Sequence, residues 1–193
     1  MEIVIVRHGE TEYNKTKRIQ GQQQVSLNEN GRTQARKVAE SLKHYGFTHI
    51  YCSNLKRAKE TADIINESFL LPVLTDSRLD ERNWGGWENK NLDEIIKECP
   101  NLKNNVRLGI WDFTPNRAET VQNLIDRSVE FFQDIARRHH ESDVILVVTH
   151  GGPMRTMLGF IKNLDPTEYM NQDINNGQMY RVEYKNSRFS FKS

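Results

Sequence analysis

The stretch EIVIVRHGETEYN, residues 2–14, changes character between one residue and the next. Residues 2–6, EIVIV, include four β-branched aliphatic residues in a row. Such a run is too short for a helix and is typical of a strand buried on both faces. Arg7, His8 and Gly9 follow at once. Polar side chains are costly to bury without partners, so a cation and an imidazole at the end of a buried strand need a physical reason.

Short apolar strands and amphipathic helices alternate along the rest of the chain. Residues 143–149, DVILVVT, form a second continuous apolar run, and residues 48–53 predict another short strand. In the helices, apolar residues recur every three or four positions. The remaining predicted elements are helices at 31–46, 55–69, 91–99, 119–140 and 154–161, an extended segment at 72–81, a loop at 100–117, and a hairpin of strands at 178–184 and 188–191.

This alternation predicts the fold class. Strands that alternate with helices build an α/β fold, here a three-layer sandwich with a mostly parallel central sheet and helices on both faces. The chain has 193 residues, enough for one domain with a sizeable core but not clearly for two. We therefore expect residues 1–193 to form a single domain.

Composition and charge exclude several classes of function. Lys and Arg number 27 against 26 Asp and Glu, a net charge of +1, so no overall positive field predicts a nucleic-acid or membrane partner. The apolar run at 2–6 is shorter than a signal-peptide core, and no stretch approaches the roughly 18 apolar residues of a membrane span. Two cysteines, Cys52 and Cys99, lack zinc-site spacing and are expected to be buried thiols. These features predict a cytoplasmic protein.

The polar residues that follow the strands belong at one edge of the sheet. Parallel strands present their carboxyl ends together, and such folds bind ligands there. Arg7 and His8 follow the strand at 2–6, and Arg57 lies in the first helical turn after the strand at 48–53. Glu81 ends the extended segment at 72–81, and His150 follows the strand at 143–149. Each residue alone has an ordinary structural explanation, such as a solvated helix face for Arg57. Their shared edge instead predicts an anion-binding site.

Four stretches resemble the motifs of the histidine phosphatase superfamily, the phosphoglycerate-mutase-like proteins. They are VRHGETEYN at 6–14, SNLKRAKETA at 53–62, LDERNWGGWE at 79–88 and VVTHGGPMR at 147–155. The similarity keeps the order of the family's motifs along nearly the whole chain. It implies the fold expected above and phosphoryl transfer through a phosphohistidine.

The resemblance also implies a role for each residue of the predicted site. His8 is the expected nucleophile, Arg7, Arg57 and His150 the expected phosphate clamp, and Glu81 the expected general acid and base. Two flanking arginines disfavour a charged His8, and its second nitrogen is expected to donate to a backbone carbonyl. His150 is expected to bind the anion as the imidazolium. The substrate-binding residues implied are Asn14, Gln20, Gly21, Gly151 and Arg82.

No metal and no cofactor are expected. The arginines and His150 supply the positive charge that a metal would bring, and no group of His, Asp and Glu residues has the spacing of a metal site. The expected partner is a small phosphorylated metabolite. A homodimer is an open alternative to a monomer.

Three functions are consistent with the sequence. The favoured one is a phosphatase that hydrolyses a small phosphomonoester. The second is a cofactor-dependent phosphoglycerate mutase, and the third is a catalytically inactive phosphate-binding regulator. Mutases of the superfamily carry a longer insertion and a shielding C-terminal tail, whereas only a short span separates Asn91 from Glu119 here, which favours hydrolysis. An α-ribazole phosphate, a phosphoserine, a sugar phosphate and broad specificity stay open, as does the role of Glu88.

Overall fold

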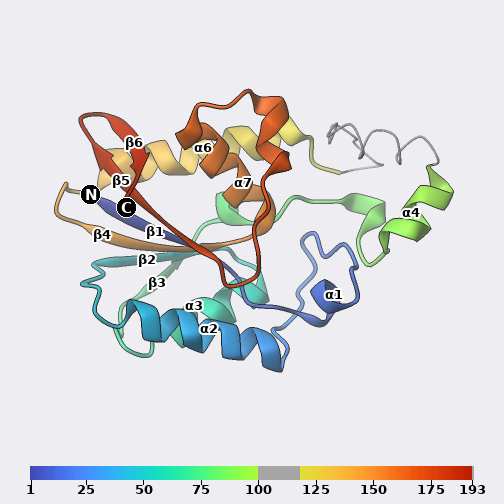
Figure 1. Ribbon diagram of the computed structural model, residues 1–193, viewed down its shortest axis with the longest axis horizontal. Helices are drawn as coiled ribbons and strands as arrows, with labels where there is room; N and C mark the ends of the chain where they lie inside the picture. Colours follow the sequence, from blue (N-terminus) through green and yellow to red (C-terminus); the bar gives the residue numbers. More distant parts are fainter. Residues whose placement is uncertain (100–117, 193) are drawn as a thin grey trace.

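Six strands form one sheet in the order β3-β2-β4-β1-β5-β6 (Figure 1). The computed structural model describes residues 1–99 and 118–192, so the predicted loop at 100–117 lies outside the described residues. The strands are β1 Glu2–Arg7, β2 His49–Cys52, β3 Val73–Thr75, β4 Val144–Thr149, β5 Met179–Lys185 and β6 Arg188–Phe191.

The centre of the sheet is parallel. β1 pairs with β4, β4 with β2, and β2 with β3, all in parallel, whereas β5 runs antiparallel to β1 and β6 antiparallel to β5. This topology confirms the predicted mostly parallel sheet. It also brings the carboxyl ends of β1, β2 and β4 to one edge, at Arg7, Cys52 and Thr149.

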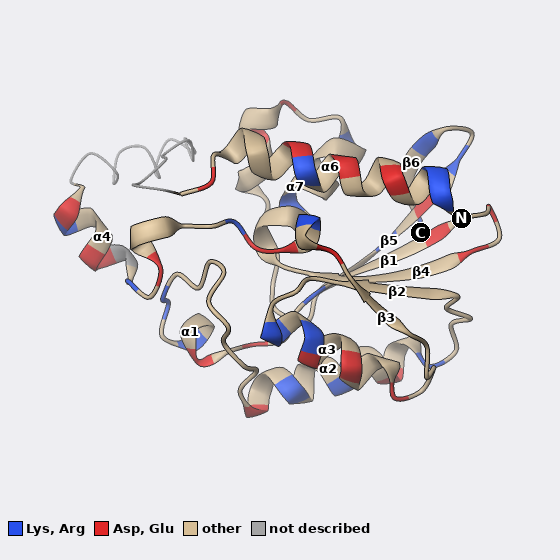
Figure 2. Ribbon diagram, turned by 180° about the vertical axis from the view of Figure 1, so that it is seen from behind, with Lys and Arg blue, Asp and Glu red and all other residues tan. Residues whose placement is uncertain are grey.

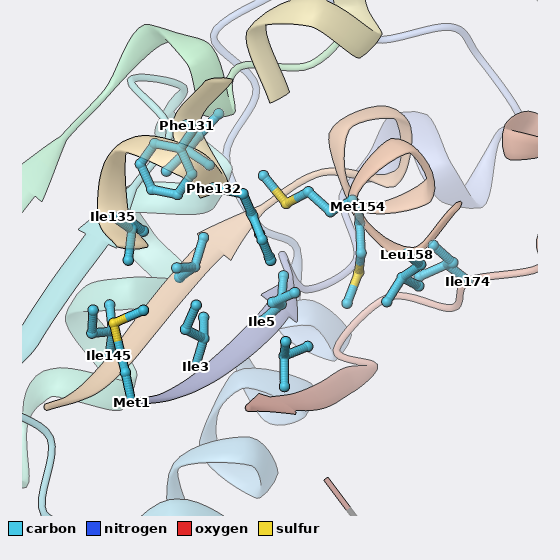
Figure 3. Close-up of a cluster of buried hydrophobic side chains, with 14 residues drawn as sticks. Met1, Ile3, Ile5, Phe131, Phe132, Ile135, Ile145, Met154, Leu158 and Ile174 are labelled. Atoms are coloured by element: carbon cyan, nitrogen blue, oxygen red, sulfur yellow. The ribbon is translucent and has the colours of Figure 1, made fainter. Parts of the chain in front are cut away.

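Alternate residues of the central strands belong to two separate hydrophobic cores, one on each face of the sheet. Ile3 and Ile5 of β1 belong to one cluster of buried side chains, which includes Phe131 and Phe132 (Figure 3). The intervening residues of β1, like those of β4, belong to a second cluster on the opposite face. Because both faces of each strand are buried, the strands are apolar throughout rather than alternating, as the run at 2–6 indicated.

Helices cover both faces of the sheet (Figure 1). α2 (Glu29–Leu42) and α3 (Lys56–Asn66) pack on one face, and α6 (Val121–Arg138) and α7 (Gly151–Lys162) pack on the other. Figure 2 shows charged residues spread along α2, α3 and α6, while the central strands carry few. The predicted three-layer sandwich is therefore confirmed. The shorter elements are α1 Glu12–Lys15, α4 Leu92–Glu98, and the 3-10 turns Ser77–Leu79, Gly85–Trp87 and Pro166–Asn171.

Capping side chains explain where the helix ends differ from prediction. α2 begins at Glu29, before the predicted 31, because the side chain of Asn28 accepts the N–H of Gly31. α6 begins after Thr120, whose hydroxyl accepts the N–H of Asn123. The predicted extended segment at 72–81 keeps only β3 as a strand.

The two cysteines differ in exposure. Cys52 is buried as predicted, but Cys99 is exposed, so the expectation of two buried thiols is wrong for the second. Cys99 lies at the C-terminal end of the short helix α4, away from both cores. Within the described residues, no helix is both long and apolar enough to cross a membrane.

Candidate active site

A pocket of about 320 Å³ lies where the parallel strands end. Its lining comes from β1, α3, the loop after α1, the segment after β3, and α7. Eight of the ten predicted site residues line it, namely Arg7, His8, Asn14, Gln20, Gly21, Arg57, Glu81 and Arg82. The shared sheet edge therefore brings together side chains that are far apart in sequence.

The other two predicted residues lie behind the wall of the pocket. The His150 side chain is fully buried, and its ring centroid lies 4.9 Å from that of His8. Gly152 lines the pocket in place of Gly151. A Cβ on Gly151 would lie 2.9 Å from Arg155 Nη1 and 3.6 Å from Arg7 Nε, so this glycine lets the two guanidiniums approach the helix.

The two ring nitrogens of His8 have different partners. Nδ1 lies 2.6 Å from the carbonyl oxygen of Gly9, and since a carbonyl only accepts, Nδ1 carries the proton. Nε2 lies 3.2 Å from Arg57 Nε, which donates to it. The neutral ring therefore keeps its lone pair on Nε2, as the predicted bond to a backbone carbonyl requires. Burial, then the charges of Arg57 and Arg7, hold the pKa of His8 well below its usual range.

Close contacts between backbone segments fix the position of His8. A Cβ on Gly9 would lie 2.3 Å from the carbonyl oxygen of Gly31, and a Cβ on Gly31 would lie 2.0 Å from that of Glu10. The turn after β1 thus packs directly on the first turn of α2. Side chains at either glycine would separate the two segments.

The two arginines are held by main-chain oxygens. Arg57 is fully buried, and its Nη1 and Nη2 donate to the carbonyls of Gln23 and Gly21 at 2.9 and 2.8 Å. Arg7 Nη1 donates to Ile174, while its buried Nε has no partner among the described residues. Burial lowers the pKa of each arginine to about 10, so both stay charged at neutral pH. An anion would meet two positive charges that no carboxylate neutralises completely.

A chain of short hydrogen bonds runs behind His150. Its Nε2 lies 2.7 Å from the hydroxyl of Ser53, and that hydroxyl donates to Asp80 Oδ1 at 2.7 Å. Ser53 therefore accepts from His150, so Nε2 carries the ring proton and the buried, unpartnered Nδ1 carries the lone pair. Burial, then Arg57 and His8, hold the pKa of His150 well below its usual range. In the free protein His150 is neutral, not the imidazolium expected for the bound state.

Glu81 lies across the pocket at the start of α7. Its Oε1 accepts the N–H groups of Arg82 at 2.8 Å and of Gly152 at 3.1 Å. A carboxylate beside a helix N-terminus is stabilised by the unpaired N–H groups of the first turn. The position of the Glu81 carboxylate is thus fixed by two backbone N–H groups.

Glu88, the alternative acid, has a different position. Its Oε1 accepts the N–H groups of Gln22 and Trp84, and its Oε2 accepts from the Gln23 side chain. It does not line the pocket. Glu88 joins the loop after α1 to the segment after Glu81, so its role in this structure is to hold the pocket wall.

Several residues of the pocket were not predicted from the sequence. Lys17, Arg18 and Arg155 add positive charge to its lining, and Leu124 and Met170 add apolar surface. Arg155 lies four residues after Gly151 on the same helix, so a helix start at Gly151 predicts that both share a face. Lys17, at a positive φ of 55°, follows a short helix that periodicity did not reveal.

A larger hollow of about 950 Å³ lies between α6, α7 and the hairpin of β5 and β6. Its lining includes Arg137, Lys185, Arg188 and Phe189 but no histidine and no carboxylate. Among the described residues that line it there is no pair of nucleophile and acid, so the smaller pocket is the candidate active site.

Comparison with known proteins places the chain in a family. The family described as the histidine phosphatase superfamily, branch 1, matches residues 3–193. The chain is 42% identical over 159 residues to phosphoglycerate mutase-like protein 4 of Arabidopsis thaliana, covering 81% of this chain and 69% of that protein. It is 33% identical over 187 residues to the probable phosphoglycerate mutase GpmB of Escherichia coli, covering 97% of this chain and 86% of that protein.

A solved structure extends the similarity to three dimensions. The mycobacterial glucosyl-3-phosphoglycerate phosphatase, solved in complex with VO3, superposes with a TM-score of 0.89 at 27% identity, covering 99% of this chain and 96% of that one. The sheet order, the pocket at its edge and these matches agree with one another. The chain belongs to the histidine phosphatase superfamily, branch 1.

Proposed function

We propose that the protein is a metal-independent phosphatase that hydrolyses small phosphomonoesters through a phosphohistidine on His8. The observation that carries the proposal is the tautomer of His8: Gly9 fixes the proton on Nδ1, so Nε2 presents its lone pair in a pocket that is otherwise rich in cations. Arg7 and Arg57 serve two purposes: their positive charges keep the nucleophile His8 neutral, and the same charges bind the phosphate. The phosphatase named above is similar in structure and supports the same reaction class.

The reaction proceeds in two steps. His8 Nε2 attacks phosphorus, an N–P bond forms, and the P–O bond to the leaving group breaks while Glu81 gives that oxygen a proton. Water then attacks the phosphohistidine, the N–P bond breaks, and Glu81 takes the proton from the water. The products are an alcohol and inorganic phosphate. Arg7 and Arg57 neutralise the phosphoryl oxygens in both steps.

His150 enters this scheme as a proton-dependent donor. It is neutral in the free protein, with Nδ1 as the acceptor atom. A dianionic phosphoryl group favours the charged ring, so His150 takes up a proton with the substrate and then donates from Nδ1. Ser53 and Asp80 are positioning residues, because the carboxylate of Asp80, through the Ser53 hydroxyl, stabilises the proton on Nε2.

The outer cations of the pocket suggest the kind of leaving group. Lys17 and Arg155 form no ion pair within the described residues, and both line the pocket. The Asn14 Oδ1 accepts from Thr11, which leaves its amide N–H groups for a ligand. We therefore expect phosphomonoesters with a second anionic group, such as a carboxylate, to be bound more tightly than neutral ones.

A phosphomonoester panel tests the proposal. Purified protein is mixed with phosphoserine, 3-phosphoglycerate, glycerol 3-phosphate and α-ribazole phosphate, and inorganic phosphate release is followed in the presence of excess EDTA. We expect turnover of at least one ester, with a lower KM for the two carboxylates than for glycerol 3-phosphate. No phosphate release from any ester, combined with tight vanadate binding, would instead support a catalytically inactive regulator.

A further inference from the structure

Two histidines and an aspartate meet at the end of the sheet opposite the pocket. His49 is the first residue of β2, His139 follows the last turn of α6, and Asp143 precedes β4. One ligand atom from each, a ring nitrogen or a carboxylate oxygen, lies within 4.8 Å of the other two. His139 and Asp143 are four residues apart, but His49 lies far before them in the sequence, so sequence spacing did not reveal the group.

His49 holds one nitrogen ready to act as a ligand. The Thr48 hydroxyl donates to the carbonyl of Val144, so it accepts from His49 Nδ1 at 2.9 Å. The proton of the neutral ring is therefore on Nδ1, and the lone pair is on Nε2. No hydrogen bond reaches Nε2 from the part of the chain that the structure describes.

His139 and Asp143 complete the group from the other side. Asp143 Oδ2 accepts the N–H of His140 at 2.9 Å and lies 3.3 Å from His139 Nδ1. The remaining nitrogen of His139 lies 2.9 Å from the hydroxyl of Tyr51. The side chains of His139 and Asp143 are only 7% and 14% exposed, so little water competes for these atoms.

We propose that His49 Nε2, His139 Nδ1 and a carboxylate oxygen of Asp143 bind a divalent transition metal ion, with Zn²⁺ the best match. Two imidazoles and one carboxylate are a donor set that suits Zn²⁺, with bonds of about 2.0–2.2 Å and a water in the fourth position. Tetrahedral geometry needs ligand atoms about 3.3 Å apart, so the most distant pair closes by up to about 1.5 Å, shared between two side chains.

The outer contacts fit the same assignment. A histidine that binds a metal commonly donates its other N–H to an oxygen, which fixes the ring. Thr48 provides that oxygen for His49, and Tyr51 provides it for His139 once Nε2 carries the proton. Mg²⁺ and Ca²⁺ prefer oxygen ligands, so a site with two nitrogens selects against them.

The metal would add a bond between three segments that already touch through the His49 and His139 rings and through Tyr51 and His139. It would connect the start of β2, the end of α6 and the segment before β4 at the edge far from the phosphate pocket. Since it binds the folded chain and not the unfolded one, it raises Tm in proportion to the logarithm of its concentration above Kd. The inference does not depend on the proposed phosphatase activity.

The test compares metal binding in matched variants. All proteins carry Cys99→Ser, which removes the exposed thiol, and are treated with EDTA and desalted. Zn²⁺, Co²⁺ and Mg²⁺ are added separately, and Tm and, for Co²⁺, the visible absorption of a four-coordinate ion are measured. The variants are His49→Gln and Asp143→Asn, and the control is His44→Gln, which removes an exposed histidine outside the group.

We expect one Zn²⁺ per chain, a rise in Tm of about 5–10 °C at 100-fold excess over Kd in the parent and in His44→Gln, and no effect of Mg²⁺. In His49→Gln and Asp143→Asn the rise is lost and Co²⁺ absorption falls at least tenfold, while circular dichroism without metal is unchanged. Absence of Zn²⁺ binding in the parent overturns the proposal, and so does equal binding in His49→Gln.

Discussion

At His8 one ring nitrogen is committed to a backbone carbonyl and the other faces a guanidinium. This division has a direct consequence for mutagenesis. His8→Ala is expected to reduce turnover by at least about 10³-fold, because no other neutral nucleophile is among the described residues that line the pocket. Circular dichroism and hydrolysis of p-nitrophenyl phosphate measure fold and activity together. Exposed His44→Ala is the control, and activity of His8→Ala within tenfold of the parent would remove His8 from the mechanism.

The role of Glu81 as general acid is tested by comparing esters with poor and good leaving groups. Glu81→Gln keeps the shape of the side chain but cannot give a proton, so hydrolysis of an alkyl phosphate is expected to slow by about 10²–10⁴-fold. A nitrophenolate leaves without a proton, so p-nitrophenyl phosphate is expected to slow much less. Glu88→Gln is the comparison, since Glu88 holds the pocket wall and its loss would affect both esters alike. Equal slowing by Glu81→Gln would assign the acid elsewhere.

The pH profile reports the chain of hydrogen bonds behind His150. Asp80→Asn removes a negative charge that favours the proton on His150, so the pKa of that ring in the complex falls. His150 must be charged to donate, so the alkaline limb of kcat, which reports the complex, moves to lower pH, with a loss of about tenfold near neutrality. Ser53→Ala is expected to shift the same limb. A uniformly lower profile of unchanged shape would show a purely structural role.

The elements of the fold were predictable wherever burial is uniform. β1 and β4 are covered on both faces, so their apolar runs indicated strands directly. Helices with a continuous apolar stripe were found, but their ends depended on single capping side chains such as Asn28. The one-turn helix α1 was missed because its stability comes from a capping box of Thr11 and Asn14 and not from a buried face.

The site was predictable to the same extent, for a related reason. Arg7 and His8 lie at the end of β1, and Arg57 lies in the first turn of the helix after β2, so the topology alone places them at one edge. Arg155 depends on the exact start of α7, and the link from Ser53 to Asp80 depends on the distance between two turns. Such details are properties of packing, which sequence patterns do not encode locally.

The contact between the turn after β1 and helix α2 makes a prediction at the level of elements. Gly31→Ala places a methyl group 2.0 Å from the Glu10 carbonyl oxygen, so the two segments must separate. We expect a loss of about 1–3 kcal/mol in the free energy of unfolding. A lower kcat is also expected, since His8 lies next to the contact. Thermal and urea unfolding measure the first effect.

Gly46→Ala is the matched control for that change. A Cβ at Gly46 meets no atom within 4 Å, so the free energy of unfolding should stay within about 1 kcal/mol of the parent. If Gly31→Ala were as stable and as active as Gly46→Ala, the close contact would not position the nucleophile.

For the whole molecule, the central choice is between hydrolysis of the substrate and mutase activity, in which the phosphoryl group is transferred to a second hydroxyl. The relatives named phosphoglycerate mutases make this comparison necessary. A mutase must hold a second hydroxyl against the phosphohistidine more effectively than water at about 55 M, which requires a closed site of high effective molarity. Lys17, which lines the described part of the pocket, is exposed, and Arg18 beside it is partly exposed, so water reaches these pocket residues. We therefore expect hydrolysis to dominate.

The measurement follows two products at once. The protein is mixed with 3-phosphoglycerate and a catalytic amount of 2,3-bisphosphoglycerate, and both 2-phosphoglycerate and inorganic phosphate are recorded. Phosphate is expected to form faster than 2-phosphoglycerate. If 2-phosphoglycerate forms much faster than phosphate is released from any tested monoester, the mutase assignment replaces the phosphatase.

The position of β1 in the sheet also has a consequence for the order of synthesis. β1 lies between β4 and β5, and Glu2 pairs with both Val144 and Glu183. A ribosome makes β1 and His8 well before β4 and β5, so for a long interval β1 has neither neighbour. Until then the aliphatic run at 3–6 has no sheet to join and is a target for chaperones. His8 likewise has no His150 beside it, and Glu81 has no helix α7 to contact, so a nascent chain carries the nucleophile in an unassembled site.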